Sequence, residues 1–119
     1  MGIVIKDLVQ SNNSRAFIDG SSRAAEILST SFVGLGTYKP GWKWSEHAGK
    51  QTGKPSEKHI GYIISGSFVV QGPSGQEEIV SAGQAFELSA GHDAWVNGDE
   101  PCIALDFGCI QDKEQLGSE

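Results

Sequence analysis

The feature that most constrains the fold is the succession of short alternating segments separated by glycine-containing turns. Glycine supplies 16 of the 119 residues, and it is the residue that tight turns accept most readily. Period-two alternation dominates, and the best helical candidate, residues 23–28, is short and runs into β-branched residues. Many short strands joined by regular turns predict an all-β domain, built as a sandwich or a barrel.

The expected strands lie between clear turn signals. The sharpest is the segment 72–75, where Pro73 sets φ and Gly75 supplies a positive φ. Pro40 and Gly41 mark another break, and the polar segment 48–56 is expected to be a loop. The predicted strands are residues 3–5, 25–38 (as one or two strands), 57–65, 67–71, 76–80, 85–88, 93–97 and 102–107.

The length predicts one domain, residues 1–119. A chain of this size buries a core without disulfides or metals as staples, and its 38% hydrophobic and 20% charged residues are ordinary for a globular protein. We expect the core to span about residues 25–108. The polar residues 111–119 are expected to form a flexible tail.

Charge and composition argue against several classes of partner. The formal net charge is −6 and the pI about 4.9, so the chain repels a phosphate backbone and nucleic-acid binding is not expected. No apolar run approaches the ~20 residues of a membrane span, and the first ten residues lack the apolar core of a signal peptide. These features predict a cytoplasmic protein that does not associate with membranes.

Several chemical signatures are missing from the sequence. Cys102 and Cys109 lack metal-ligand spacing and are expected to be free thiols. No glycine-rich phosphate loop is present, so no nucleotide cofactor is expected. No Gly-x-Ser-x-Gly elbow is present either, which disfavours serine hydrolysis.

Two glycine-framed motifs lie between residues 40 and 107. In the second, seven residues separate Gly83 from Gly91, and His92 follows directly. This spacing resembles the second motif of the cupin family, which has Gly, five residues, Pro, one residue, Gly, two residues, His, three residues and Asn. Ser89 replaces the proline, Ala94 replaces the metal-ligating His, and the closing Asn is absent.

The other motif is framed by Gly41 and Gly66. The first cupin motif has Gly, a spacer, His-x-His, three or four residues, Glu, six residues and Gly. His47 stands alone where the His pair is expected, and His59 stands at the position of the Glu. The loop 48–56 is longer than the family spacer. The whole pattern looks like that of a small bacterial cupin subgroup with degenerate metal motifs.

The resemblance implies a fold and an assembly. The fold is a single-domain cupin-type β-barrel, also called a double-stranded β-helix or jelly roll, around one central pocket. Small cupins pair through sheet-to-sheet contact, so a homodimer is implied as well. An exposed apolar β surface makes this assembly physically reasonable.

His47, His59 and His92 are the only histidines, and all three fall within the two motifs. Neutral imidazole is the commonest ligand of divalent transition metals, so we expect the three to hold Fe, Mn, Ni or Zn. On a strand, His92 and Ala94 would share a face, although the turn at Gly91 can break this parity. The alternative is that the histidines are ordinary polar residues without a metal.

Five neighbouring residues are candidates for the pocket wall or for hydrogen bonds to metal-bound imidazoles: Glu46, Glu57, Trp44, Asp93 and Trp95. Glu46 and Glu57 are reserve metal ligands, or carboxylates that would orient a ligating imidazole. The alternative for each is a solvated side chain. Tryptophan serves in a core, a dimer contact or a pocket wall.

Other residues have structural expectations. Asp93 and Asp106 lie in strands that should be partly buried, and a buried carboxylate needs a partner or a raised pKa. Either could act as a general base. Phe68, Phe86 and Phe107 are expected in the core.

Two functions fit these features, and the sequence leaves the choice open. One is a metal-dependent enzyme that acts on a small polar organic molecule such as a sugar acid, another carboxylate or an oxygenated aromatic compound. The other is a non-catalytic module that binds or senses a small ligand without a metal, which the degenerate ligand set favours.

Overall fold

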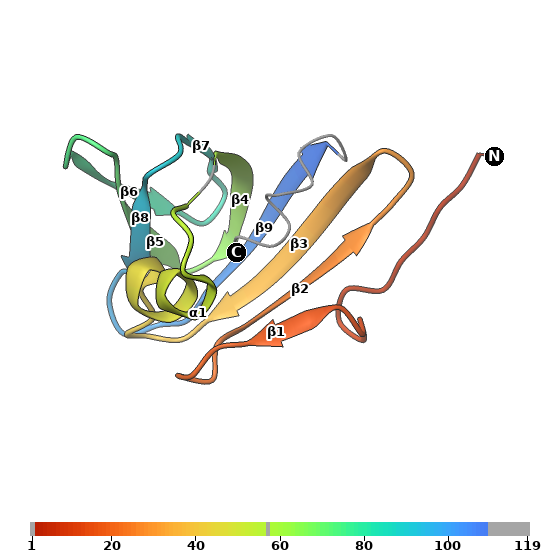
Figure 1. Cartoon of the computed structure of the whole chain (residues 1–119), viewed down its shortest axis with the longest axis horizontal. Coiled ribbons are helices and arrows are strands. Elements are labelled where there is room, and N and C mark those ends of the chain that lie inside the picture. The colour runs from red at the N-terminus through yellow and green to blue at the C-terminus, as the bar shows by residue number, and fades with distance from the viewer. Residues whose placement is uncertain (1, 57, 110–119) are drawn as a thin grey trace.

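The computed structural model describes residues 2–56 and 58–109. The described residues form nine strands and two short helical segments (Figure 1). In chain order these are β1 (Ser14–Ala16), β2 (Ser22–Ile27), β3 (Ser31–Tyr38), η1 (Ser45–Gly49), α1 (Lys50–Thr52), β4 (His59–Ser65), β5 (Ser67–Gln71), β6 (Glu77–Ser81), β7 (Ala85–Leu88), β8 (Asp93–Val96) and β9 (Cys102–Cys109).

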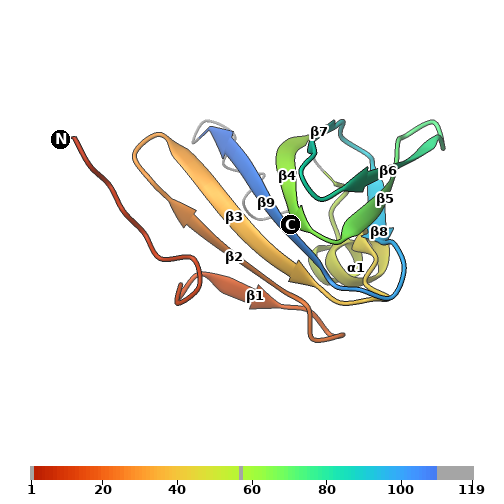
Figure 2. The same ribbon diagram turned by 180° about the vertical axis from the view of Figure 1, so that it is seen from behind.

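All described strand pairs are antiparallel and form two sheets. The larger sheet has the order β1-β2-β3-β9-β4-β7, and the smaller has the order β6-β5-β8. In Figures 1 and 2, β1, β2, β3 and β9 form an extended wing, whereas β4 and β7 lie next to the small sheet. The predicted all-β architecture is therefore confirmed.

Side-chain alternation places the core on the inner face of the large sheet. On β4, Gly61 and Ile63 are buried, whereas Ile60, Tyr62 and Ile64 are exposed. This is the alternation that the sequence predicts. The core between the sheets consists of aromatic and small apolar side chains: Phe17, Tyr38, Trp42, Trp44, Ala48, Ile63, Phe68, Val80, Val96, Cys102 and Ala104.

The segment after β3 is helical rather than extended. It begins as a π-helical turn, η1, continues into α1 and ends at Gly53, whose φ of 69° closes the last turn. The prediction of a loop over 48–56 is therefore wrong for its first half. The polar, glycine-containing composition of the segment conceals the helix, because the segment buries only Ala48 and has no amphipathic period.

Two other local predictions are wrong. Residues 3–5 are not a strand. The expected strand region 25–38 does form two strands, β2 and β3, and residues 23–28, the best of the weak helical candidates, contribute most of β2. β1 was not expected. Phe107 is 37% exposed rather than in the core, because Asp106 takes the inward position on β9 and alternation turns Phe107 outward. The tail 111–119 lies outside the described residues.

The helical segments have one further property. Neither η1 nor α1 is long and apolar enough to cross a membrane, and the described residues contain no other helix.

Candidate functional site

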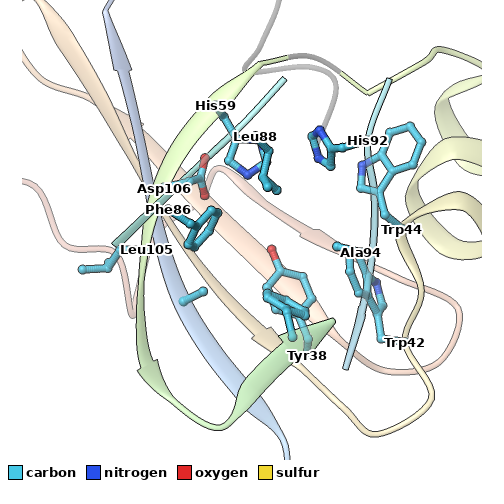
Figure 3. A pocket seen from close by; sticks show the side chains of 12 residues that line it. Tyr38, Trp42, Trp44, His59, Phe86, Leu88, His92, Ala94, Leu105 and Asp106 are labelled. Atoms are coloured by element: carbon cyan, nitrogen blue, oxygen red, sulfur yellow. The ribbon is translucent and has the colours of Figure 1, made fainter. Parts of the chain in front are cut away.

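A cavity lies between the two sheets, below the turn that carries Trp44 (Figure 3). Its volume is about 30 Å³, enough for about two water molecules at roughly 10–15 Å³ each. Twelve residues from both sheets and from the segment before η1 line it: Tyr38, Trp42, Trp44, His59, Phe68, Phe86, Leu88, His92, Ala94, Ala104, Leu105 and Asp106. Most of the wall is aromatic or aliphatic, and the polar groups are few.

Two of the three histidines meet at one end of this cavity. His59 begins β4 and His92 directly precedes β8, and their ring centroids lie 5.1 Å apart with the planes at 69°. Figure 3 shows both rings at the same end of the cavity, with Trp44 beside His92. The edge of His59 also packs on Phe86, 5.9 Å away between ring centroids. The cavity wall therefore fixes the relative position of the two imidazoles.

Backbone contacts hold His92 in place. Its Nδ1 lies 2.8 Å from the carbonyl oxygen of Ser89. A carbonyl only accepts, so Nδ1 carries a proton that it donates to Ser89. The buried Ser56 donates its hydroxyl to the carbonyl oxygen of His92 at 2.6 Å, and its own carbonyl accepts from Gly91 at 3.0 Å. These two hydrogen bonds of Ser56 stabilise the turn that precedes His92. As the prediction of a shared face requires, His92 and Ala94 both line the cavity.

Two indole groups border the cavity with their N–H groups buried. Trp42 and Trp44 are 3% and 7% exposed, and neither Nε1 atom has a hydrogen-bond acceptor among the described residues. Figure 3 shows the nitrogen of Trp44 on the ring edge that faces His92, with the two ring centroids 6.3 Å apart. Indole nitrogen only donates, so the cavity offers a buried donor next to an imidazole.

A buried ion pair lies along the large sheet beside the cavity. Arg23 on β2 donates from Nε to Oδ1 of Asp106 at 3.1 Å and from Nη2 to Oδ2 at 2.6 Å. The two side chains are 4% and 10% exposed. The pair spans β3 above Gly34, where a Cβ atom would lie 2.6 Å from the carboxylate and 2.7 Å from the guanidinium. Asp106 therefore has the partner that its predicted burial requires.

The opposite end of the cavity is aromatic. The ring centroid of Tyr38 lies 4.4 Å from that of Trp42 and 5.4 Å from that of Phe68. Figure 3 shows the hydroxyl of Tyr38 pointing toward the cavity interior. The sequence analysis did not select Tyr38, although an alternation count from Phe32 places it on the inward face of β3.

The third histidine lies elsewhere. Nδ1 of His47 is 3.0 Å from the backbone nitrogen of Lys43 and 3.1 Å from its carbonyl oxygen. The ring stacks on Trp42, with centroids 6.4 Å apart and planes at 19°. His47 is not among the residues that line the cavity. His47 lies on the helical turn η1, against Trp42.

The remaining candidates are distributed over two places. Trp44 lines the cavity. Glu46 and Trp95 border a separate surface hollow of about 210 Å³, where the ammonium of Lys43 lies 4.9 Å from the Trp95 ring centroid. Asp93 accepts from the backbone nitrogen of Ser45 at 3.0 Å and is not a lining residue of the cavity.

One candidate cannot be placed. Glu57 lies outside the described residues.

The described residues do not assemble the expected three-histidine metal site. His59 and His92 approach each other, His47 contacts Trp42 and does not line the cavity, and the carboxylate of Asp106 is held at both oxygens by Arg23. Over residues 2–56 and 58–109, no group of three His, Cys, Asp or Glu side chains is placed to share one ion. A catalytic metal centre commonly has three protein ligands. The described residues bring two histidines together, and the candidate Glu57 lies outside them.

The thiol of Cys102 adds no nucleophile. Cys102 is fully buried in the core, and burial raises its pKa from 9.0 to about 12. A thiol with such a pKa stays protonated near neutral pH, and the thiolate is the reactive form.

Comparison with known proteins identifies the fold. No family model and no curated protein matches the sequence. An RmlC-like cupin from Shewanella frigidimarina matches with a TM-score of 0.63 at 14% identity, covering 88% of each chain. A sugar phosphate isomerase of the cupin superfamily from Silicibacter pomeroyi matches with a TM-score of 0.63 at 20% identity, covering 88% of this chain and 74% of that chain.

A third solved structure has a similar fold. KdgF from Halomonas sp. has a TM-score of 0.57 at 18% identity, covering 81% of this chain and 84% of that chain. At these identities the similarity establishes the fold and leaves the activity open. The predicted cupin-type jelly roll is confirmed.

Proposed function

We propose that this chain, which has the cupin fold, is a small-ligand-binding protein whose site is the cavity between the two sheets and whose binding needs no metal. The observation that carries the proposal is the buried indole N–H of Trp44, which borders the cavity and has no acceptor among the described residues. A buried donor without an acceptor costs about 1–3 kcal/mol. A ligand that supplies the acceptor recovers that free energy.

The wall of the cavity supports this function. Aromatic and aliphatic groups form most of it, and a few polar groups, namely His59, His92 and Trp44, converge at one end. Ligand sites commonly combine an apolar wall with a small number of placed polar groups. The volume of about 30 Å³ limits the ligand to a few non-hydrogen atoms unless the wall moves.

The segment most suited to enlarge the cavity is the one that carries Trp44. Trp44 directly precedes the π-helical turn η1, and its ring packs on Gly49, where a Cβ atom would lie 2.8 Å from the indole. π-helical turns are rare and frequently occur at functional sites. An outward shift of η1 would move Trp44 and admit a larger ligand.

The metal-dependent enzyme is the competing function. Its support is the approach of His59 and His92 and the contact of His92 Nδ1 with the Ser89 carbonyl, which fixes the orientation of the ring. Its weakness is that His47 contacts Trp42 and does not line the cavity. The two functions make opposite predictions for metal content.

The deciding experiment is elemental analysis of untagged protein before and after exposure to Fe, Mn, Ni and Zn, combined with melting temperatures in a metabolite panel. We expect substoichiometric metal and a ligand-dependent rise in melting temperature that survives chelator. The rise should disappear in His92→Phe and persist in His47→Phe. Near-stoichiometric metal that is lost in both variants would contradict the proposal and favour the enzyme.

A further inference from the structure

The chain changes its mode of attachment after Lys43. Before it, the backbone carbonyl of Trp42 accepts a hydrogen bond from the backbone of β8 at 3.1 Å, and the Trp42 side chain is 3% exposed in the aromatic core. After it, residues 44–52, which we call the Trp44 segment, bury only two side chains, those of Trp44 and Ala48. Segments with few buried side chains open at a lower free energy than the core does.

A side chain from β8 holds the beginning of the Trp44 segment. Oδ1 of Asp93 accepts a hydrogen bond from the backbone nitrogen of Ser45 at 3.0 Å. Ser45 is the first residue of η1, and the first N–H groups of a helix have no acceptor within it. The ammonium of Lys43 lies 4.0 Å from Oδ2 of Asp93, and a partly exposed pair of this kind contributes little. The hydrogen bond to Ser45 is therefore the main polar contact between Asp93 and the segment.

The buried position of Trp44 also has a cost. Its indole N–H has no acceptor among the described residues, and a buried donor without an acceptor is destabilising. Figure 3 shows this indole at the edge of the cavity, beside His92, and an outward movement would expose its N–H to water. The ring packs on Gly49 of the same segment, where a Cβ atom would lie 2.8 Å from the indole, so the ring and the helical turn form one unit. The Asp93 contact favours the closed position of this unit, and the indole N–H favours the outward one.

We propose that the Trp44 segment is a gate, which moves outward about Lys43 to admit a ligand, and that Asp93 is the positioning residue that holds the gate closed. The cavity measures about 30 Å³, so a molecule larger than a few atoms enters only when the wall moves. A ligand that supplies an acceptor to Trp44 would then favour the closed gate around it. The inference rests on the proposed function, because a gate serves a cavity that takes up a ligand.

Native-state hydrogen exchange of the indole N–H groups tests the gate without any ligand. NMR follows the exchange of Trp42 and Trp44 in deuterated water, with each resonance assigned from its loss in Trp42→Phe or Trp44→Phe. Trp42 is the matched reporter, because it borders the same cavity but is anchored before Lys43. In the wild-type protein we expect Trp44 to exchange roughly tenfold faster than Trp42 or more, with little dependence on low urea. The Trp42 rate should rise with urea, because global unfolding exposes much more surface.

Three variants separate opening of the gate from global unfolding. Asp93→Ala should accelerate Trp44 exchange roughly tenfold, because opening no longer breaks the hydrogen bond at the start of η1. Ile63→Val removes a buried methyl group from β4, outside the Trp44 segment, so it should accelerate Trp42 severalfold and leave Trp44 unchanged. Asp99→Ala removes a carboxylate from an exposed turn and should change neither rate.

Each outcome decides one part of the inference. If Asp93→Ala fails to fold, Asp93→Asn gives the same comparison with a smaller expected change, because it keeps an acceptor oxygen and loses only the charge. Equal rates and equal urea dependence for Trp42 and Trp44 would show that only global unfolding releases Trp44, and would overturn the gate. A Trp44 rate that neither Asp93 variant changes would overturn the role of Asp93. Both results leave the proposed function standing, because that function fails on near-stoichiometric metal content instead.

Discussion

Arg23 and Asp106 are 83 positions apart in the sequence, yet they form a buried two-point ion pair across β3. The pair is possible because Gly34, which lies between them, has no side chain to occupy the space. It links strand β2 to strand β9, and the guanidinium of Arg23 neutralises the Asp106 carboxylate that borders the cavity. This ion pair therefore stabilises the large sheet and also neutralises a carboxylate in the cavity wall.

Removing one partner of this pair should destabilise the protein strongly. Asp106→Ala leaves the buried guanidinium of Arg23 without its carboxylate, which costs about 3–5 kcal/mol. We expect a correspondingly lower free energy of unfolding in urea. The double variant Arg23→Met with Asp106→Leu should lose much less, because no charge remains buried. Equal losses in the single and double variants would show that packing, not charge, holds the two strands.

Ser56 should matter for both stability and the site. Its hydroxyl donates to the carbonyl oxygen of His92 at 2.6 Å inside the protein. Ser56→Ala leaves that carbonyl without this donor, and we expect a loss of about 1–2 kcal/mol in urea unfolding together with weaker ligand binding. The exposed hairpin residue Ser74 is the matched control, and Ser74→Ala should change neither quantity. Unaltered binding in Ser56→Ala would mean that the turn holds His92 without this hydrogen bond.

The Cys102 thiol should resist alkylation in the folded protein. In a Cys109→Ser background, Cys102 is the single cysteine, and its pKa is raised to about 12 by burial. We expect iodoacetamide to react with it at pH 9 far more slowly in buffer than in urea, in which the thiol has its ordinary pKa. Comparable rates in the two solvents would place Cys102 at the surface.

The same pKa difference predicts how stability depends on pH. The folded thiol binds its proton more tightly than the unfolded thiol does. Its contribution to stability is therefore complete below pH 9 and is lost as the pH rises toward 12. Urea unfolding of the Cys109→Ser protein between pH 8 and 11 measures this decline. Adding Cys102→Ala should flatten this part of the pH profile, and an identical decline in both proteins would assign it to other groups.

We propose that the homodimer implied by the sequence forms through the outer face of the large sheet. Register places Val33, Phe107 and Ile60 side by side there, and it places Leu35, Leu105 and Tyr62 in the next row. A continuous apolar surface of this kind suits a second copy of the same face around a twofold axis.

A charge on this face should separate the dimer. Tyr62 is 39% exposed, and Tyr62→Lys would bury an unpaired ammonium at the contact, so we expect light scattering to report a monomer. Ile79 is 59% exposed on the small sheet, and Ile79→Lys should leave the mass unchanged. A wild-type monomer, or a dimer that tolerates Tyr62→Lys, would contradict the proposed interface.

Much of the β structure could be predicted from local pattern. The strands 67–71 and 85–88 agree with β5 and β7 at both ends, and the inward side of β4 follows from alternation. These features depend on neighbouring residues, because alternation and turn chemistry act over a few positions. The same local logic places His59 and His92 beside the core.

Other parts of the site depend on contacts between distant residues. No pattern in the sequence joins Arg23 to Asp106 or separates His47 from the other two histidines. The helical turn η1 was missed because residues 45–52 bury a single side chain, which leaves no helical period to detect. Yet this turn decides which of Trp44 and His47 borders the cavity.

The sequence by itself determined the all-β class and which side of β4 faces the core. It also indicated that His59 lies on the inward side of its strand, because periodicity and turns depend on consecutive residues. Only the tertiary structure decided that two histidines meet, that the third does not line the cavity and that the carboxylate of Asp106 is neutralised by an arginine from β2. Those facts depend on how the strands pair and how one short segment folds over them, and strand pairing joins residues whose separation carries no local signal.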